Sequence, residues 1–311
     1  MASVFVTRAL PGDATGRLSA GHEVEVWPER APPPAEKLRA AAANADALLT
    51  MLTDRVDRDL IAAAPSLRAI ANYAVGTDNV DLDAATERGI PVGNTPDVLT
   101  DTTADLAWAL LMAGARRLGE GERDVRAGAW PPFTPDLYLG QDVHGATLGI
   151  VGFGRIGQAV ARRAEGFVMK VLHTRENEVD EILRRSDFVS LHTPLTPETR
   201  GLIGARELAL MQPHAILVNT ARGEVVDTDA LVDALEAGRI GGAALDVTDP
   251  EPLPADHPLL RAPHVTVVPH IGSATTRTRA AMADMAVDNL LAALSGERMP
   301  HVANPEVYEG A

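Results

Sequence analysis

Three residue types that could reduce a carbonyl group follow strand-like runs in the last third of the chain. Arg222 comes after the run AILVNT, Glu251 after ALDV in a proline-rich loop, and His270 after VTVV. A guanidinium can hold a carboxylate through two parallel hydrogen bonds. An imidazole titrates near neutral pH, and a neighbouring carboxylate keeps it protonated and ready to act as an acid. The set predicts reduction of a 2-oxo acid, with Arg222 as the carboxylate anchor.

Each of these residues also has a simpler explanation when it is taken alone. An arginine is usually solvated, a glutamate between prolines is usually a turn residue, and a loop histidine is usually structural. His192, in the run SLHTPLT, also ends a strand-like segment and is a second candidate for the acid. The ordered set of arginine, glutamate and histidine beside a nucleotide-binding motif favours His270.

That motif lies in TLGIVGFGRIG, residues 147–157, where an apolar run is followed by Gly152, Gly154 and Gly157. The spacing is G-x-G-x-x-G, and the amphipathic segment QAVARRAEGF follows it. The first glycine permits the tight turn, the second admits a pyrophosphate close to the backbone, and the third lets helix and strand pack closely. A strand, turn and helix in this order predict a dinucleotide at the N-terminus of the helix.

The end of the next strand indicates which dinucleotide is bound. The segment KVLHTREN places Arg175 where an aspartate would bind the ribose hydroxyls of NAD, and Glu176 follows it. A guanidinium suits a 2′-phosphate, so NADP(H) is favoured. The alternative is NAD(H), with Arg175 solvated and Glu176 in the acidic role.

Two series of strand-like runs predict the elements that position these residues. A chain of 311 residues favours two domains, and the alternation of strands with helical segments favours parallel sheets covered on both faces. We therefore predict an α/β protein with two doubly wound parallel-sheet domains, a Rossmann cofactor domain (99–283) inserted in a flavodoxin-like substrate domain (1–98 and 284–311). One long helix is predicted over 99–128 and another ends near Gly296. The predicted strands are 4–8, 22–28, 45–52, 67–75 and 90–95, then 147–153, 169–174, 187–192, 215–220, 241–247 and 264–270.

The composition and charge of the chain exclude or disfavour several classes of function. The chain has no cysteine, which excludes disulfides and thiolate chemistry, and no metal site is predicted. A formal charge of −15 disfavours nucleic acid and anionic membranes as partners. No signal peptide or apolar run of membrane-spanning length is visible, so a cytoplasmic protein is expected.

Full-length motifs resemble the D-isomer-specific 2-hydroxyacid dehydrogenases. They include YAVGTDNVDLDAATERGI, GIVGFGRIGQAVARRA, SDFVSLHTPLTPETRGLI, VNTARGEVVDTDALVDALEAGRIGGAALDV and PHIGSAT. TPDVLTDTTADLAWALL and DVTDPEPLPADHPLL resemble the glyoxylate/hydroxypyruvate reductases (D-glycerate dehydrogenases) within that family. This resemblance implies NAD(P)H-dependent reduction of glyoxylate to glycolate and of hydroxypyruvate to D-glycerate.

The resemblance also implies a role for particular residues. Arg222, Glu251 and His270 match the catalytic set, and Leu52, Val75 and Gly76 join Arg222 and His270 around the substrate. A homodimer is implied, paired through the arm around 100–145, where Trp130 or Phe133 would reach the partner's substrate site. The residues implied to line the cofactor, besides the three glycines and Arg175, are Thr103, Arg155, Ile156, Pro194, Thr199, Thr220, Ala221, Arg222, Asp246, His270 and Gly272.

Two departures from the family pattern stand out. The segment 175–186 is shorter than usual, close to the least a crossover between parallel strands needs, and should leave the adenosine side open. Val168 replaces a family glycine, which would strain the chain if that position needs a positive φ. The alternatives for function are another D-2-hydroxyacid dehydrogenase such as 3-phosphoglycerate dehydrogenase, or a non-catalytic NAD(H)-sensing protein that resembles corepressors of this fold.

Overall fold

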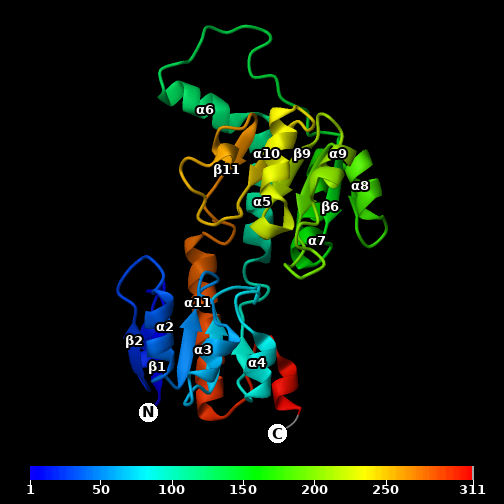
Figure 1. Ribbon diagram of the computed structural model, residues 1–311. Coiled ribbons are helices and arrows are strands. Elements are labelled where there is room, and N and C mark those ends of the chain that lie inside the picture. Colours follow the sequence, from blue (N-terminus) through cyan, green and yellow to red (C-terminus); the bar gives the residue numbers. More distant parts are fainter. Residues whose placement is uncertain (310–311) are drawn as a thin grey trace. The chain divides into compact units, whose positions relative to one another are not determined.

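The chain divides into two compact units, which Figure 1 shows in a computed structural model that describes residues 1–309. The first unit consists of Met1–Leu99 and the segment that begins at Ser273, and the second is Thr100–Gly272. The sequence-predicted boundary at 283/284 falls inside a helix that the structure keeps whole in the first unit. This helix, α11 (Thr276–Ser295), packs on strands of the first unit, so it belongs to that unit.

The first unit is built on a five-stranded parallel sheet with the order β2-β1-β3-β4-β5. This is the flavodoxin-like order that the sequence predicts. β3 and β4 are buried at every residue, as expected for strands covered on both faces, whereas the edge strand β2 alternates with solvent. The strands are β1 (Ser3–Val6), β2 (Glu23–Val26), β3 (Ala47–Thr50), β4 (Ala69–Asn72) and β5 (Val92–Gly93).

Helices cover both faces of this sheet (Figure 1). α2 (Ala35–Ala42), α3 (Arg58–Ala62) and α4 (Leu82–Glu87) pack Leu38, Leu60, Ile61 and Ala84 on one face. α1 (Ala14–Ser19) and α11 (Thr276–Ser295) lie together, and α11 packs on β3, β4 and β5. Thr275 caps the first turn of α11, and Gly296, with φ of 85°, ends it at the predicted position.

The second unit is built on a six-stranded parallel sheet with the order β11-β10-β9-β8-β6-β7. The strand order reverses at β6, and ligands of open α/β sheets bind outside the carboxyl ends of the strands at such a point. The glycine motif follows β6 directly. The strands are β6 (Thr147–Val151), β7 (Lys170–His173), β8 (Phe188–Leu191), β9 (Ile216–Asn219), β10 (Gly242–Leu245) and β11 (Val265–Val267).

Two apolar layers cover this second sheet. α5 and α7 pack with Leu110, Leu148, Ile150 and Phe188 on one face, while the helices α8, α9 and α10 cover the other face. The short crossover 175–186 still forms a helix, which buries Ile182 and Leu183. The helices are α5 (Thr100–Ala115), α6 (Leu118–Arg126), α7 (Arg155–Ala164), α8 (Val179–Arg185), α9 (Ala205–Leu210) and α10 (Thr228–Glu236). The 3-10 turns of this unit are η1 (Glu165–Phe167), η2 (Gly223–Val225) and η3 (Pro258–Leu260), and the first unit contains η4 (Pro305–Tyr308).

These sheets confirm the predicted α/β class with two doubly wound domains, but the single long helix predicted over 99–128 is wrong. Arg117 has a φ of 54°, which ends α5 and starts α6 in a new direction. The N–H of Gln141 donates to the carbonyl of Ala115 (2.8 Å) and so closes the end of α5. Val168, the replaced glycine, does have a positive φ of 54°. Within residues 1–309, no helix combines the length and the apolar character that a bilayer crossing requires.

Candidate active site

The glycine turn after β6 has the geometry of a phosphate cradle. Gly152 has a φ of 93°, and a Cβ there would lie 2.5 Å from the carbonyl carbon of His192. A Cβ at Gly157 would lie 2.3 Å from the carbonyl oxygen of Gly152, which explains why α7 packs so close to β6. A Cβ at Gly154 would meet nothing within 4 Å, so open space borders the turn. α7 begins directly after Gly154, with no side-chain hydrogen bond from its N-cap, and the N-terminus of a helix is a favourable place for an anion. These residues fit a dinucleotide.

Beside the cradle, three side chains form a stack that includes Arg175. The rings of Phe153 and His173 are 3.7 Å apart, and the Arg175 guanidinium lies 5.6 Å from the Phe153 ring centre. Phe153 belongs to the glycine turn itself, so its contact with the guanidinium holds Arg175 beside that turn. Glu176 is exposed, with its carboxylate 3.9 Å from the His173 ring.

His270 and Glu251 are in direct contact. Nδ1 of His270 lies 2.7 Å from Oε1 of Glu251, and both side chains are only partly exposed, at 25% and 31%. Because Nδ1 is taken by the carboxylate, Nε2 is the ring nitrogen available to a substrate. A histidine in this arrangement can donate a proton to a carbonyl oxygen.

Asp246 fixes the turn that carries His270. His270 has a left-handed φ of 51°, and its N–H donates to the carbonyl of Asp246 (2.9 Å). The buried Asp246 carboxylate accepts the next two N–H groups, from Ile271 (2.6 Å) and Gly272 (2.8 Å). Burial raises the pKa of this carboxyl, against the lowering effect of those two bonds and of His270. Sequence reasoning placed Asp246 on the cofactor and missed that it also shapes the histidine turn.

Arg222 lies in the loop that follows β9. The Asn219 side chain bridges this loop: its Nδ2 donates to the carbonyl of Arg222 (2.8 Å) and its Oδ1 accepts from the N–H of Ala221 (3.0 Å). A Cβ at Gly223 would lie 2.0 Å from the carbonyl oxygen of Thr248, so this loop packs tightly on the one that leads to Glu251. Asn219 is a buried amide at a strand end, a signal that was visible in the sequence but was not used.

His192, the competing histidine, has a different environment. Its Nε2 lies 2.8 Å from the hydroxyl of Ser190 and its Nδ1 lies 3.5 Å from that of Thr220. Burial lowers the pKa of His192 to about 4, which keeps the ring neutral at physiological pH. A neutral buried imidazole is a poor proton donor. The environment of His192 therefore does not suit the role of the acid.

The other predicted cofactor residues lie at the carboxyl ends of strands or at helix starts in the second unit. Pro194 and Thr199 follow β8 and are joined by a hydrogen bond from the Thr199 hydroxyl to the Pro194 carbonyl (2.6 Å). A Cβ at Gly272 would lie 3.1 Å from Asp246 and 3.5 Å from Thr103, so these three residues meet. Arg155 and Ile156 begin α7, and Thr220 and Ala221 follow β9.

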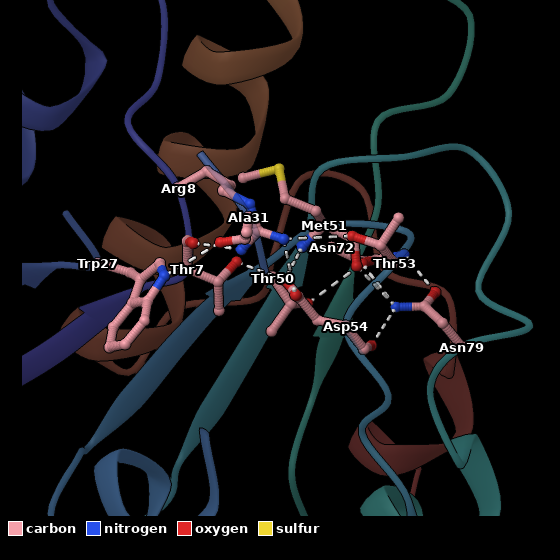
Figure 2. A network of polar contacts seen from close by, with 10 residues as sticks. All are labelled: Thr7, Arg8, Trp27, Ala31, Thr50, Met51, Thr53, Asp54, Asn72 and Asn79. Atoms are coloured by element: carbon pink, nitrogen blue, oxygen red, sulfur yellow. Dashed lines mark hydrogen bonds and ion pairs between the residues drawn. The ribbon is translucent and has the colours of Figure 1, made fainter. Parts of the chain in front are cut away.

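The three predicted substrate residues outside this group belong to the first unit. Leu52 lies in the turn after β3, and Val75 and Gly76 lie in the loop after β4. Figure 2 shows the polar network at this edge of the sheet, which joins the two loops. The predicted substrate residues of the first unit, Leu52, Val75 and Gly76, therefore lie in two loops that one polar network connects. Arg222, Glu251 and His270 lie in loops of the second unit.

Together, the parallel sheet, the glycine cradle and the histidine–glutamate pair define a dinucleotide-dependent oxidoreductase. Comparison with known proteins agrees: residues 108–272 match the model of the D-isomer specific 2-hydroxyacid dehydrogenase, NAD binding domain. A protein named glyoxylate reductase from Thermococcus gammatolerans is 51% identical over 98% of this chain and 97% of its own.

Two solved structures are also similar over nearly the whole chain. A protein from Thermus thermophilus has a TM-score of 0.91 and 50% identity, covering 97% of this chain and 99% of its own. An NADPH-dependent glyoxylate/hydroxypyruvate reductase from Sinorhizobium meliloti, in complex with NADP and malonate, has a TM-score of 0.85 and 33% identity, covering 97% of each chain. The chain belongs to the D-isomer specific 2-hydroxyacid dehydrogenase family and is an NAD(P)-dependent 2-hydroxyacid dehydrogenase.

Proposed function

We propose that this enzyme reduces glyoxylate to glycolate and hydroxypyruvate to D-glycerate. The observation that carries the proposal is the 2.7 Å contact between Nδ1 of His270 and the Glu251 carboxylate, which holds an acid ready with Nε2 free. Relatives at about half identity are named glyoxylate reductase, and a solved structure at 33% identity is named glyoxylate/hydroxypyruvate reductase, which supports these two substrates. A small 2-oxo acid offers the two groups that these residues recognise, a carboxylate and an adjacent carbonyl.

Each residue has one task in this reaction. A bound reduced nicotinamide supplies the hydride that C2 of the substrate accepts. His270 donates a proton from Nε2 to the carbonyl oxygen, and Glu251 stabilises the charged imidazole before the transfer. Arg222 holds the carboxylate through its planar guanidinium. In the first unit, Leu52 and the N–H groups of Val75 and Gly76 are the substrate-binding groups.

For the cofactor, we propose that NADP(H) is preferred over NAD(H). The Arg175 guanidinium stacks near Phe153 of the glycine turn, and a planar cation held there suits a 2′-phosphate. Arg175→Ala should lower kcat/KM for NADPH more than for NADH. Equal losses for both cofactors, or a wild-type preference for NADH above tenfold, would contradict this assignment.

The proposed reaction is tested with initial rates for glyoxylate, hydroxypyruvate, pyruvate and 3-phosphohydroxypyruvate, each with NADH and NADPH. His270→Ala should lower kcat by about 100-fold or more, the usual share of a general acid, while cofactor binding persists. His144→Ala is the matched control, because His144 is exposed in a loop. Unchanged turnover in His270→Ala would refute the acid role. Cofactor binding without turnover of any of the four acids would favour the nucleotide-sensing alternative.

We also propose that the chain forms a homodimer through the arm that contains α6. Of nine large apolar side chains exposed in residues 1–309, five lie in this arm: Leu118, Val125, Trp130, Phe133 and Leu139. α6 buries none of its residues within its own chain. A second copy would cover this surface. Light scattering should give twice the chain mass, and replacing Trp130 and Phe133 by serine should shift the mass toward the monomer.

A further inference from the structure

Two asparagine side chains hold the backbone of the loop after β4. Nδ2 of Asn94 donates to the carbonyl of Val75 (2.8 Å), and Nδ2 of Asn72 donates to the carbonyl of Gly76 (2.9 Å). In a trans peptide the C=O and the following N–H point in opposite directions. Asn94, which binds the Val75 carbonyl, therefore turns the N–H of Gly76 away from itself. Asn72, which binds the Gly76 carbonyl, turns the N–H of Thr77 away from itself in the same way.

The N–H groups of this loop are left for an external acceptor. Among the backbone hydrogen bonds of residues 1–309, none has the N–H of Val75 or of Gly76 as its donor. Gly76 is only partly buried, so a ligand can reach this loop. Successive free N–H groups fixed in one direction form a concave anion site.

Asn72 is fully buried and is itself held by a polar network (Figure 2). Its Oδ1 accepts from the Thr50 hydroxyl (3.1 Å) and from Nδ2 of Asn79 (3.2 Å), and its Nδ2 donates to Oδ1 of Asn79 (2.9 Å). Asn79 also donates to the carbonyls of Met51 (3.0 Å) and Asp54 (2.9 Å). The loop after β4 is therefore tied to the turn after β3, which carries Leu52.

The buried Asp54 carboxylate anchors that turn. It accepts from the N–H of Met51 (2.7 Å) and from the Thr7 hydroxyl, and it lies 3.4 Å from the Arg8 guanidinium. Figure 2 shows these groups converging at the carboxyl edge of β1, β3 and β4. The turn of Leu52 and the loop of Val75 thus share one rigid support.

Asn94 has a separate support from α11. Its carbonyl accepts from Nδ2 of Asn289 (3.0 Å), its N–H donates to the carbonyl of His301 (3.2 Å), and Oδ1 of Asn289 accepts from the N–H of His301 (2.9 Å). Asn289 is fully buried. A Cβ at Gly93 would lie 2.6 Å from Nδ2 of Asn289, so only glycine lets the strand approach this amide.

We propose that Asn72 and Asn94 are positioning residues that form an amide lock, fixing the Val75–Gly76 backbone in the orientation that binds the substrate carboxylate. This inference rests on the proposed function, since it explains how that backbone binds an anion. In this proposal each asparagine acts on the loop backbone, through its hydrogen bond to the carbonyl of Gly76 or Val75. Their amides act by fixing peptide groups before the substrate arrives, which avoids the cost of ordering the loop on binding.

The decisive variant is Asn94→Asp, which keeps the shape but places an oxygen where Nδ2 donates. That oxygen repels the Val75 carbonyl and favours a turned peptide. The KM for glyoxylate should rise about 10- to 100-fold, the size of one hydrogen bond to a charged group, with a smaller change in kcat and none in the KM for the cofactor. Asn94→Ala should give a smaller rise. If Asn94 only filled space, the order would be reversed, and the KM for glyoxylate of Asn94→Asp would be closer to that of wild type than the KM of Asn94→Ala.

A pH series sharpens the test, because a protonated aspartic acid regains a donor at that position. The excess KM of Asn94→Asp over wild type should shrink as the pH is lowered. Asn44→Asp is the matched control, since Nδ2 of Asn44 also donates to a main-chain carbonyl, that of Ala40 (3.0 Å), at the exposed end of α2. An Asn94→Asp enzyme with the KM of wild type would overturn the lock.

Binding of oxamate, a carboxylate that is not turned over, separates failure of the lock from failure of the proposed function. Calorimetry with the reduced cofactor present should show weaker oxamate binding to Asn94→Asp than to wild type. A wild-type enzyme that reduces none of the 2-oxo acids contradicts the proposed function, and the oxamate comparison still decides the lock. Equal oxamate affinity in both proteins, or no binding to either, overturns it.

Discussion

Acidification should destabilise the second unit through His192, the buried histidine beside the glycine turn. Burial lowers the pKa of His192 to about 4 from its ordinary 6.5. The unfolded chain takes up a proton below pH 6.5, whereas the folded protein does not until about pH 4. The stability from this residue is therefore complete above pH 6.5 and is lost as the pH falls toward 4. At about 1.4 kcal/mol per pKa unit, the full loss is about 3 kcal/mol.

The perturbation is His192→Gln, which retains a polar side chain but cannot titrate. Trp27→Phe and Trp130→Phe leave Trp108, which packs on Phe167 inside the second unit, as the fluorescent reporter of unfolding. Urea titrations then give the free energy of unfolding from pH 7.5 to 5.0. The stability advantage of the parent over the His192→Gln variant should shrink by about 2 kcal/mol across this range.

The matched control is His144→Gln, because His144 is exposed in a loop of the same unit. Its stability relative to the parent should stay the same at every pH. The reasoning is refuted if the parent and the His192→Gln variant lose stability in parallel between pH 7.5 and 5.0. Parallel loss would mean that water or a partner reaches the ring.

Four substitutions test other features of the second unit. Val168→Gly should raise the free energy of unfolding by about 1 kcal/mol in the same titrations. The reason is that Val168 has a φ of 54°, which strains a valine, while its side chain is 67% exposed and packs little. An unchanged or lower free energy of unfolding would mean that the contacts of the valine offset the strain. Gly154→Ala should leave stability unchanged but raise the KM for the cofactor, whereas Gly152→Ala should lower stability by more than about 1 kcal/mol, because a Cβ would clash at Gly152 but not at Gly154. Asp246→Asn should lower kcat about tenfold or more by turning an acceptor of the His270 turn into a donor, and a kcat like that of wild type would count against this role.

The strands of both sheets could be predicted from the sequence because central parallel strands must be apolar on both faces. β3, β8 and β9 are buried at every residue and read as continuous runs of valine, leucine and isoleucine, with asparagine, serine or threonine among them. The single long helix that was wrongly predicted over residues 99–128 shows that such patterns do not reveal a break caused by contacts with distant residues. Neither proline nor glycine stands at the break. Arg117 is held by Glu120 (2.7 Å), which also pairs with His264 (2.8 Å), a residue 144 positions further along the chain.

Candidate active-site residues could be proposed from residue type and from position after a strand, but the residues that support them could not. Asn72, Asn94 and Asn289 have no distinctive spacing, and an asparagine near a strand end is ordinarily read as a turn former. Their function comes from which carbonyl each amide reaches, and that depends on the register of β4 and β5 and on where α11 packs. Local pattern carries no information about such long-range pairing.

His192 and His270 show the same limit most sharply. Both follow a strand of the same sheet, so their position after a strand does not distinguish them, and in the sequence only the order of Arg222, Glu251 and His270 favours His270. The structure separates them by their neighbours. His192 has only hydroxyl partners and burial lowers its pKa to about 4, whereas His270 has the Glu251 carboxylate 2.7 Å away and partial access to solvent. Because a general acid must be both protonated and reachable, our proposal assigns this role to His270, on the basis of its contact with Glu251, and not to the buried His192.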